Sequence, residues 1–294
     1  MRLLNTNTVP AVMSPEATEF IELLQLELAQ RELELPSYPN VAVQLQQLLA
    51  DDNVSTDRVV RVVGAEPILA TRVVRLASSA ALNPRGTPVS DLRNAIARLG
   101  FNALRAAATS FAVTQLRLAA RYQEILGPLT ELWNDNVTMA ATACVVARRC
   151  QRVSADTALF AGLVAGVGKI CLLARGADSR YMMTHPDEFS QIMRDWHAEV
   201  AHSLLSSWSV AEDVIEAVHG HQTHKAGSRS GLALTDVLSV ADVLSENDIT
   251  PELRLELLQT QHAAQRLGLR PDDCMALMHD SQAELALLRS ALAF

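Results

Sequence analysis

The stretch LVAGVGKICLL, residues 163–173, decides the fold class and poses the main functional question. It is an apolar run with Gly168-Lys169 at its centre, and its composition is typical of a buried helix. We predict one continuous helix over 154–175, capped by Ser154 or Asp156. Within it, Ala165 and Gly166 stand just ahead of Val167-Gly168-Lys169. Neither side chain can bind a metal or transfer a proton, so the question is what kind of protein places inert residues there.

The composition of the rest of the chain extends the helical prediction to nearly all of its length. Apolar residues make up 49% of the 294 residues, aromatic residues only 4%, and Leu, Ala and Val recur at three- and four-residue spacing. Gly and Pro are too few for a disordered chain. The four cysteines form no CxxC pair and lie among apolar neighbours, which indicates small core residues in a reducing compartment. The sequence therefore predicts an all-α globular protein.

Charge and hydropathy exclude several classes of protein. The formal charge of −8 disfavours nucleic-acid binding, which needs clustered Lys and Arg. The N-terminus lacks an apolar signal-peptide core, and we find no run of eighteen apolar residues that would span a membrane. We expect a cytoplasmic protein.

Turn residues and caps divide the first half of the chain into short helices. Ser14 and Pro15 begin the first helix, and Pro36 and Pro39 end that segment. Ser55 and Ser90 are expected to cap two further helices, and Gly100 to end the second of these. The predicted helices of this half, after the first, are about 40–50, 55–64, 66–80, 90–100 and 101–119.

The second half has longer helical segments. The last of them are amphipathic and offer a surface for a second copy of the chain, so a homodimer is one expectation. The predicted segments are 129–150, 154–175, 186–208, 211–224, 233–247 and two or three helices beyond 251.

The order of these motifs resembles the HDOD domains, divergent relatives of the HD-type metal-dependent phosphohydrolases. LPSYPNVAVQLQQLL (35–49) and TPVSDLRNAIARLGFNALR (87–105) are similar to the family's opening pattern. LFAGLVAGVGKICLL (159–173) is similar to the helix that ends in His-Asp-Ile-Gly-Lys in active HD enzymes. VLSVADVL (237–244) is similar to the closing helix, so the resemblance spans about 30–245.

The resemblance implies a two-lobed helical fold. Its parts would be an N-terminal extension helix in 1–30, the N-terminal helical lobe in 31–122, a degenerate HD-like bundle in 123–248, and C-terminal helices in 249–294.

An HD phosphohydrolase uses imidazoles and carboxylates to hold metal ions that activate water. The resemblance places Ala165 and Gly166 at the His-Asp pair, and Asp135 at the first ligand His. The polar positions that remain are His197, His221 and Asp242, so any metal would have to use these with Asp135.

Each of these residues could also have a purely structural role instead of binding a metal. His197 lies near an expected helix start, where polar groups satisfy free N–H groups. His219, His221 and His224 cluster at an expected helix C-terminus, where the helix dipole favours imidazolium. Asp242 lies on an apolar helix face, and a buried carboxylate there would pair with Arg or Lys more readily than with a metal.

Three basic residues complete the candidate set. Lys169 either extends its ammonium to the surface or pairs with Asp135 or Asp242, in place of the lost metal. Arg72 and Arg75 share a helix face, which is either plain solvated surface or a site for an acidic partner or a phosphate-bearing ligand.

The function that the resemblance implies is that of a non-catalytic bacterial signal-transduction protein. No cofactor is expected, and signalling partners would act in trans, with the cleft between the lobes as one working surface and a nucleotide-like small molecule as one ligand. The alternative is a residual metal-dependent phosphohydrolase, acting on a nucleotide or cyclic dinucleotide through Asp135, His197, His221 and Asp242.

Overall fold

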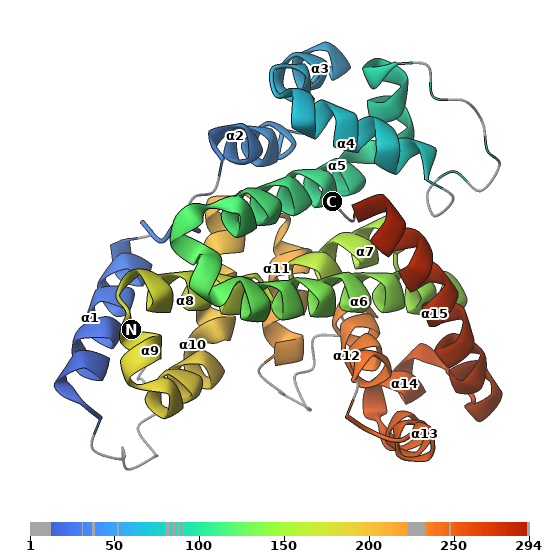
Figure 1. Ribbon diagram of the computed structural model, residues 1–294. Helices are drawn as coiled ribbons and strands as arrows, with labels where there is room; N and C mark the ends of the chain where they lie inside the picture. Colours follow the sequence, from blue (N-terminus) through green and yellow to red (C-terminus); the bar gives the residue numbers. More distant parts are fainter. Residues whose placement is uncertain are drawn as a thin grey trace.

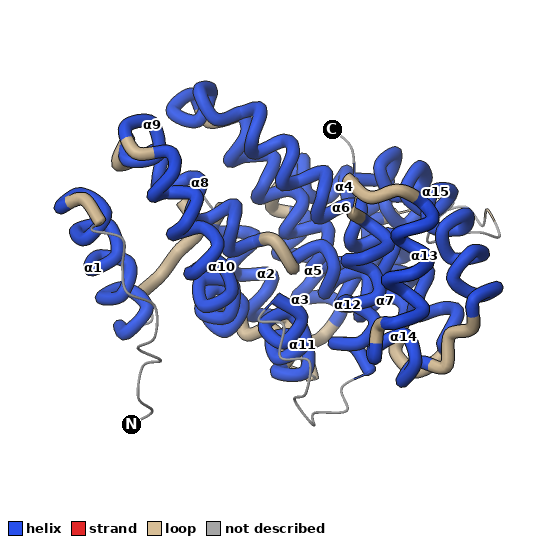
Figure 2. The backbone as a smooth tube through the Cα atoms, turned by 90° about the horizontal axis from the view of Figure 1, so that it is seen from below, coloured by secondary structure: helices blue, strands red, loops and turns tan. Residues whose placement is uncertain are grey.

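The computed structural model describes residues 13–292, apart from 31, 37–38, 52, 80–82, 84–85, 87–88, 90, 223–232 and 247. The described part is built of helices joined by short loops, with no strand, which confirms the all-α prediction (Figure 2). The helices of the first half are α1 (Pro15–Gln30), α2 (Asn40–Leu48), α3 (Thr56–Gly64), α4 (Pro67–Ser78), α5 (Leu92–Leu118) and the 3-10 helix η1 (Ala120–Ile125).

The helices of the second half are α6 (Leu126–Cys150), α7 (Ala155–Val164), α8 (Val167–Asp178), α9 (Tyr181–Thr184), α10 (Pro186–Ser207), α11 (Glu212–Gln222) and α12 (Ala233–Ser245). The C-terminal helices are α13 (Pro251–Thr260), α14 (His262–Leu267) and α15 (Pro271–Leu292).

The helices form two lobes (Figure 1). In the first, α2, α3 and α4 pack on α5. In the second, α6 lies along α7, α8 pairs with α10, and α11 and α12 pack beside them. Helix α1 covers α9 and α10 at one end, and α15 runs along α6 at the other. The core is continuous through both lobes, and three of the four cysteines are buried in it.

Helix starts follow the local chemistry of the sequence in most places. Ser14, Ser55 and Ser154 accept hydrogen bonds from backbone N–H groups in the first turns of α1, α3 and α7, as predicted. The expected cap at Ser90 is wrong, because Asp91 caps α5 and accepts from the Asn94 N–H at 2.8 Å.

Gly100 separates two helical segments without a loop. Its φ of 69° is a left-handed conformation that glycine adopts without steric cost, and the chain continues directly into the second segment of α5. The two helices predicted on either side of Gly100 are therefore present as one kinked element.

The single helix predicted over 154–175 is wrong. Helix α7 ends at Val164 and α8 begins at Val167, so the chain turns at Ala165 and Gly166. Together Ala155–Asp178 has the length and mean hydropathy (1.9) of a membrane span, but 89% of its most apolar window is buried inside the structure. The core of the second lobe therefore accounts for this apolar stretch.

Candidate functional site

Five of the seven candidate residues line one cavity of about 760 Å³ in the second lobe. It lies between α6, the α7–α8 turn, α10, α11 and the end of α12, within the bundle and not in the cleft between the lobes. The lining residues are Glu131, Leu132, Asp135, Asn136, Met139, Ala165, Gly166, Lys169, His197, His221, Asp242, Ser245, Glu246 and Asp248. We call this space the bundle cavity.

One face of α6 supplies the first wall of the bundle cavity. Glu131, Asp135 and Met139 are spaced four residues apart, so they lie on the same side of the helix. Asp135 is exposed at this wall. Partial burial raises its pKa above the usual value, the Lys169 charge opposes this rise, and the negative charges of Glu131 and Glu246 add to it. Asp135 therefore holds its proton more tightly than a fully solvated aspartate.

His197 lies in the middle of α10, so the expectation that it stands near a helix start is wrong. Its Nδ1 donates to the carbonyl oxygens of Met193 and Arg194, both at 3.0 Å. Burial and the Lys169 charge lower its pKa, although the two carbonyls oppose this. The neutral ring is favoured, with the proton on Nδ1 and the lone pair on Nε2.

Lys169 stands half-buried in the first turn of α8. It is close enough to Asp135 and His197 to lower the pKa of both. Within the described part of the chain, no carboxylate oxygen lies within 4.0 Å of its ammonium. Lys169 thus acts on Asp135 through the field of its charge and not through a direct ion pair.

The buried carboxylate of α12 is Asp236, not Asp242 as expected. Asp242 is exposed at the bundle cavity. Asp236 is 7% exposed and accepts from Arg266 of α14, whose Nε lies 2.9 Å from Oδ2. The carboxylate of this helix that pairs with an arginine is therefore Asp236, six residues before Asp242, where the side chain faces the core.

Two of the three histidines at the end of α11 lie in the described part of the chain. His221 lines the bundle cavity, whereas His219 pairs with Glu199 at 3.2 Å and packs edge-on against the ring of His202. His224 lies outside the described residues. Across the described ranges, no group of three or more His, Cys, Asp or Glu side chains could hold a metal ion.

The floor of the bundle cavity does not fit the metals of an HD enzyme. Ala165 and Gly166 offer no ligand atoms, and Lys169 adds a positive charge beside them. A Cβ on Gly166 would lie 2.1 Å from Oδ1 of Asn136, so the amide occupies the space that an aspartate side chain would need. With no group of three ligand side chains among the described residues, the donor set does not fit a resident metal pair.

A family model of the HDOD domain matches residues 35–224. The chain belongs to the HDOD family. The match covers the helices that build both lobes and most walls of the bundle cavity. A search of curated proteins found no match.

Solved structures similar to this HDOD protein support the same fold. A "Putative metal-dependent phosphohydrolase" from Shewanella amazonensis SB2B is 24% identical, with a TM-score of 0.67 over 93% of this chain and 100% of its own. An HDOD domain protein of unknown function from Geobacter sulfurreducens is 21% identical, with a TM-score of 0.65 over 92% and 100%. A "Putative signal transduction protein" from Marinobacter aquaeolei VT8 is 18% identical, with a TM-score of 0.53 over 95% and 67%.

Arg72 and Arg75 lie on α4, in the other lobe of this HDOD protein, and do not share a solvated face. Arg72 is 4% exposed, and its Nη1 donates to Ser110 at 3.4 Å and Thr114 at 3.1 Å. Burial, together with the Arg75 charge, lowers its pKa to about 10. Arg75 is exposed. Arg72 thus joins α4 to α5 from inside the lobe.

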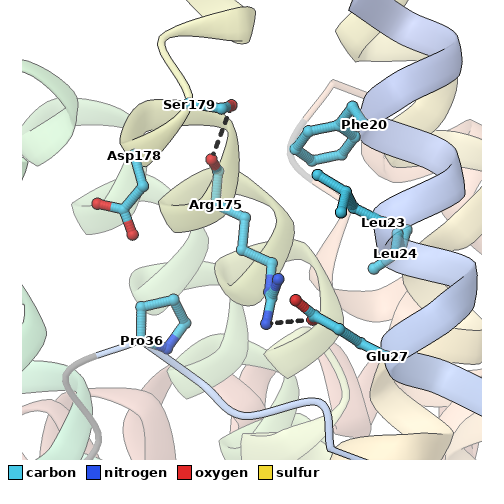
Figure 3. Close-up of a pocket in the computed structure, with 8 residues that line it drawn as sticks. All are labelled: Phe20, Leu23, Leu24, Glu27, Pro36, Arg175, Asp178 and Ser179. Carbon is cyan, nitrogen blue, oxygen red and sulfur yellow. Dashed lines mark hydrogen bonds and ion pairs between the residues drawn. The ribbon is translucent and has the colours of Figure 1, made fainter. Parts of the chain in front are cut away.

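A smaller pocket of about 250 Å³ lies between α1 and α8 (Figure 3). Arg175 of α8 reaches across it to Glu27 of α1 at 2.6 Å. At the other end of α1, Ser14 donates to Glu188 of α10 at 2.6 Å, and Tyr181 donates to the same carboxylate at 2.9 Å. These contacts hold α1 against the second lobe, and the pocket lies at the interface between them.

Sequence reasoning missed the other polar residues of the bundle cavity. Glu131 is recognisable by its four-residue spacing from Asp135 on one helix face, whereas the spacing gives no signal for Asn136. Glu246 and Asp248 follow α12, where the turn of the chain carries them back toward α6. Their charges become relevant only once the packing of α12 on α6 is known.

Proposed function

We propose that this HDOD protein is a non-catalytic signalling module whose bundle cavity binds a small ligand and passes the bound state to a protein partner in trans. One observation carries the proposal. The positions of the His-Asp pair hold Ala165 and Gly166, and the Asn136 amide fills the space over Gly166.

Phosphohydrolysis in an HD frame depends on metal ions that polarise the phosphate and lower the pKa of bound water. In the bundle cavity Asp135 and Asp242 belong to separate walls, and Lys169 occupies the region between α6 and α10. Ala165 and Gly166 supply no ligand atoms beside it, and in the described residues no three His, Cys, Asp or Glu side chains come together as a metal-ligand group. What remains is a polar cavity suited to recognition.

Regulation through partners is consistent with the names of similar structures. One of them is called a signal transduction protein and another has no known function, while a third is called a metal-dependent phosphohydrolase. Exposed apolar side chains on the C-terminal helices, at Leu253, Leu257 and Met275, offer a contact surface for a partner or a second copy.

The alternative of a residual phosphohydrolase has one observation in its favour. Asp135, His197, His221 and Asp242 do line the same cavity. If they bound metal, their separation would require the walls to move together, because no three of them form a ligand group in this arrangement.

Metal analysis separates the two functions. The tag-free protein, expressed with added manganese, iron and zinc, is expected to carry only substoichiometric metal and to leave generic phosphodiester substrates intact. One tightly held ion per chain, lost in an Asp135→Ala/His197→Ala variant and coupled to hydrolysis, would establish the phosphohydrolase instead.

A further inference from the structure

We infer that the chain associates with a second copy of itself, and that helix α13 of one copy docks in a groove on the first lobe of the other. Both surfaces lie outside the bundle cavity, so the inference goes beyond the proposed function and does not depend on what that cavity binds.

An open, mainly apolar groove of about 500 Å³ lies between α4 and the second segment of α5. Its lining includes the buried ring of Phe111 and two aliphatic side chains, Ile68 of α4 and Leu118 of α5, which are 51% and 69% exposed. Exposed aliphatic side chains gathered around an apolar groove mark a contact site for another protein. We call this space the lobe groove.

The lobe that carries this groove is basic, although the whole chain is acidic. Residues 40–122 contain ten arginines, no lysine and five Asp or Glu residues, so their formal charge is +5. Since the chain carries −8 overall, the remaining residues carry −13. Two parts of one molecule with charges of opposite sign attract each other between copies.

Arginines also lie beside the lobe groove itself. The Arg72 guanidinium lies 5.6 Å from the centre of the Phe111 ring. Arg75 is exposed two turns after Ile68, on the same side of α4. Glu66 also lines the groove, but its carboxylate accepts from the Ile68 N–H at 3.3 Å, where the positive end of α4 offsets its charge. The surroundings of the lobe groove therefore favour an acidic occupant.

The exposed face of α13 has the complementary chemistry. Leu253 and Leu257 are exposed and lie four residues apart, so they form one apolar stripe along the helix. Glu252 and Glu256, which are also exposed, form an acidic stripe directly beside it. Helix α13 packs on α12, α14 and α15 with its other residues. Docking of α13 would place its leucines in the lobe groove and its carboxylates near the arginines.

The dimensions of the two surfaces agree. Along their helices, Leu253 and Leu257 are about 6 Å apart, whereas Phe111 and Leu118 are about 10 Å apart. Both leucines therefore fit within the length of the lobe groove. A helix that lies in an apolar groove and inserts side chains four residues apart is a recurrent mode of protein recognition.

The two surfaces lie at opposite ends of the molecule. In Figure 1 the first lobe is at the top and α13 is at the bottom, with the second lobe between them. The contact therefore joins two copies, and it joins a different surface of each, which makes it heterologous. Because the contact is small, we expect the association to be weak and to depend on concentration.

Sedimentation of the full chain over a range of concentrations tests the inference. We expect species heavier than the 31.9 kDa monomer to appear as the concentration rises. Ile68→Gln/Leu118→Gln removes the apolar contacts of the groove, and Leu253→Gln/Leu257→Gln removes those of α13. Each variant should associate at least about tenfold more weakly than the wild type. Thermal unfolding of each variant establishes that it is folded.

A mixture of the two variants gives the sharpest test. The groove variant keeps an intact α13, and the α13 variant keeps an intact groove. An equimolar mixture should therefore form a dimer with one copy of each, although neither variant associates alone. An interface made by one surface with its own symmetry mate would not recover in this way.

The matched control is Leu23→Gln/Leu26→Gln, which changes two exposed leucines of α1 in the same manner. This variant should associate as the wild type does. An equal loss in the control would mean nonspecific apolar contact and would overturn the inference.

Other outcomes overturn the inference in distinguishable ways. A wild type that stays monomeric at its highest soluble concentration would exclude the second copy and leave the lobe groove to an acidic helix of another protein. The role proposed for the bundle cavity would be untouched by that result. Groove and α13 variants that associate as the wild type does would place the interface elsewhere. Loss of association in both, without recovery in the mixture, would show that the two surfaces do not bind each other.

Discussion

The Asn136 amide and Gly166 are steric counterparts: a Cβ on Gly166 would lie 2.1 Å from Oδ1 and 3.0 Å from Cγ of Asn136. At the positions where the resemblance to HD enzymes places a His-Asp pair, an aspartate would therefore meet the Asn136 side chain. The Asn136 side chain of α6 fills the volume beside the α7–α8 turn, so a larger residue at Gly166 requires that side chain to shift.

Placing a His-Asp pair at positions 165 and 166 should destabilise the protein for steric reasons. We expect Ala165→His/Gly166→Asp to destabilise the protein by about 1–3 kcal/mol, because the new aspartate overlaps the Asn136 side chain in a packed floor. Adding Asn136→Ala should recover part of that loss. Urea unfolding of the double and triple variants measures both effects, and equal stabilities of the two would show that Asn136 does not cause the conflict.

Gly168 sets the distance between α8 and α10. A Cβ at this position would lie 2.0 Å from the His197 carbonyl oxygen and 2.9 Å from the Ala201 nitrogen. Since both are backbone atoms of one helix, Gly168→Ala must push α8 and α10 apart, and we expect a loss of about 1–3 kcal/mol.

The control for that variant is Gly127→Ala, because a Cβ on Gly127 meets no atom within 4 Å. In the first turn of α6 this change should be neutral or stabilising by about 0.5 kcal/mol. Thermal unfolding of both variants gives the comparison, and similar melting temperatures would refute the close approach of α8 and α10.

Lys169→Met should raise the pKa of both His197 and Asp135. The Lys169 charge lowers each of these values, by repelling the imidazolium and by stabilising the carboxylate. Titration followed by NMR on the His197 ring and the Asp135 carboxyl carbon measures the two shifts. Arg93→Met, a loss of positive charge in the first lobe, should move neither, and an unchanged His197 in Lys169→Met would place the ammonium elsewhere.

Asp273 of α15 binds Arg149 of α6, and this contact makes the stability of the protein depend on pH in the acid range. Hydrogen bonds from Arg149 and from Arg270 lower its pKa to about 2. The folded value lies below that of an unfolded aspartate, about 3.9, so the contribution to stability is complete above that pH and is lost as the pH falls toward 2.

Unfolding of the wild-type and Asp273→Asn proteins as a function of pH tests this linkage. The wild type should be the more stable at neutral pH, and the difference should close as Asp273 becomes protonated. Asp57→Asn, which breaks an exposed pair with Arg93, should have little effect at any pH. A difference that persists undiminished at low pH would contradict the assignment.

Local features of the sequence determined the helical class, the motif order of the HDOD family and most helix starts. Caps such as Ser14, Ser55 and Ser154 act within one turn of the chain, so they are recognisable without tertiary information. Ser90 and Asp91 are both capping residues next to each other, and only the backbone geometry selects Asp91.

Which of these residues meet at the bundle cavity depends on the tertiary structure alone. The convergence of Asp135, Lys169, His197, His221 and Asp242 depends on how α6, α8, α10, α11 and α12 are rotated against one another. Helical spacing predicts which residues share a face but not which element packs on that face. The sequence pattern therefore favours Asp242 as the buried carboxylate, whereas the packing buries Asp236. The break at Ala165 and Gly166 has the same origin, because close packing of α8 on α10, and Asn136 over Gly166, involve residues distant in the chain.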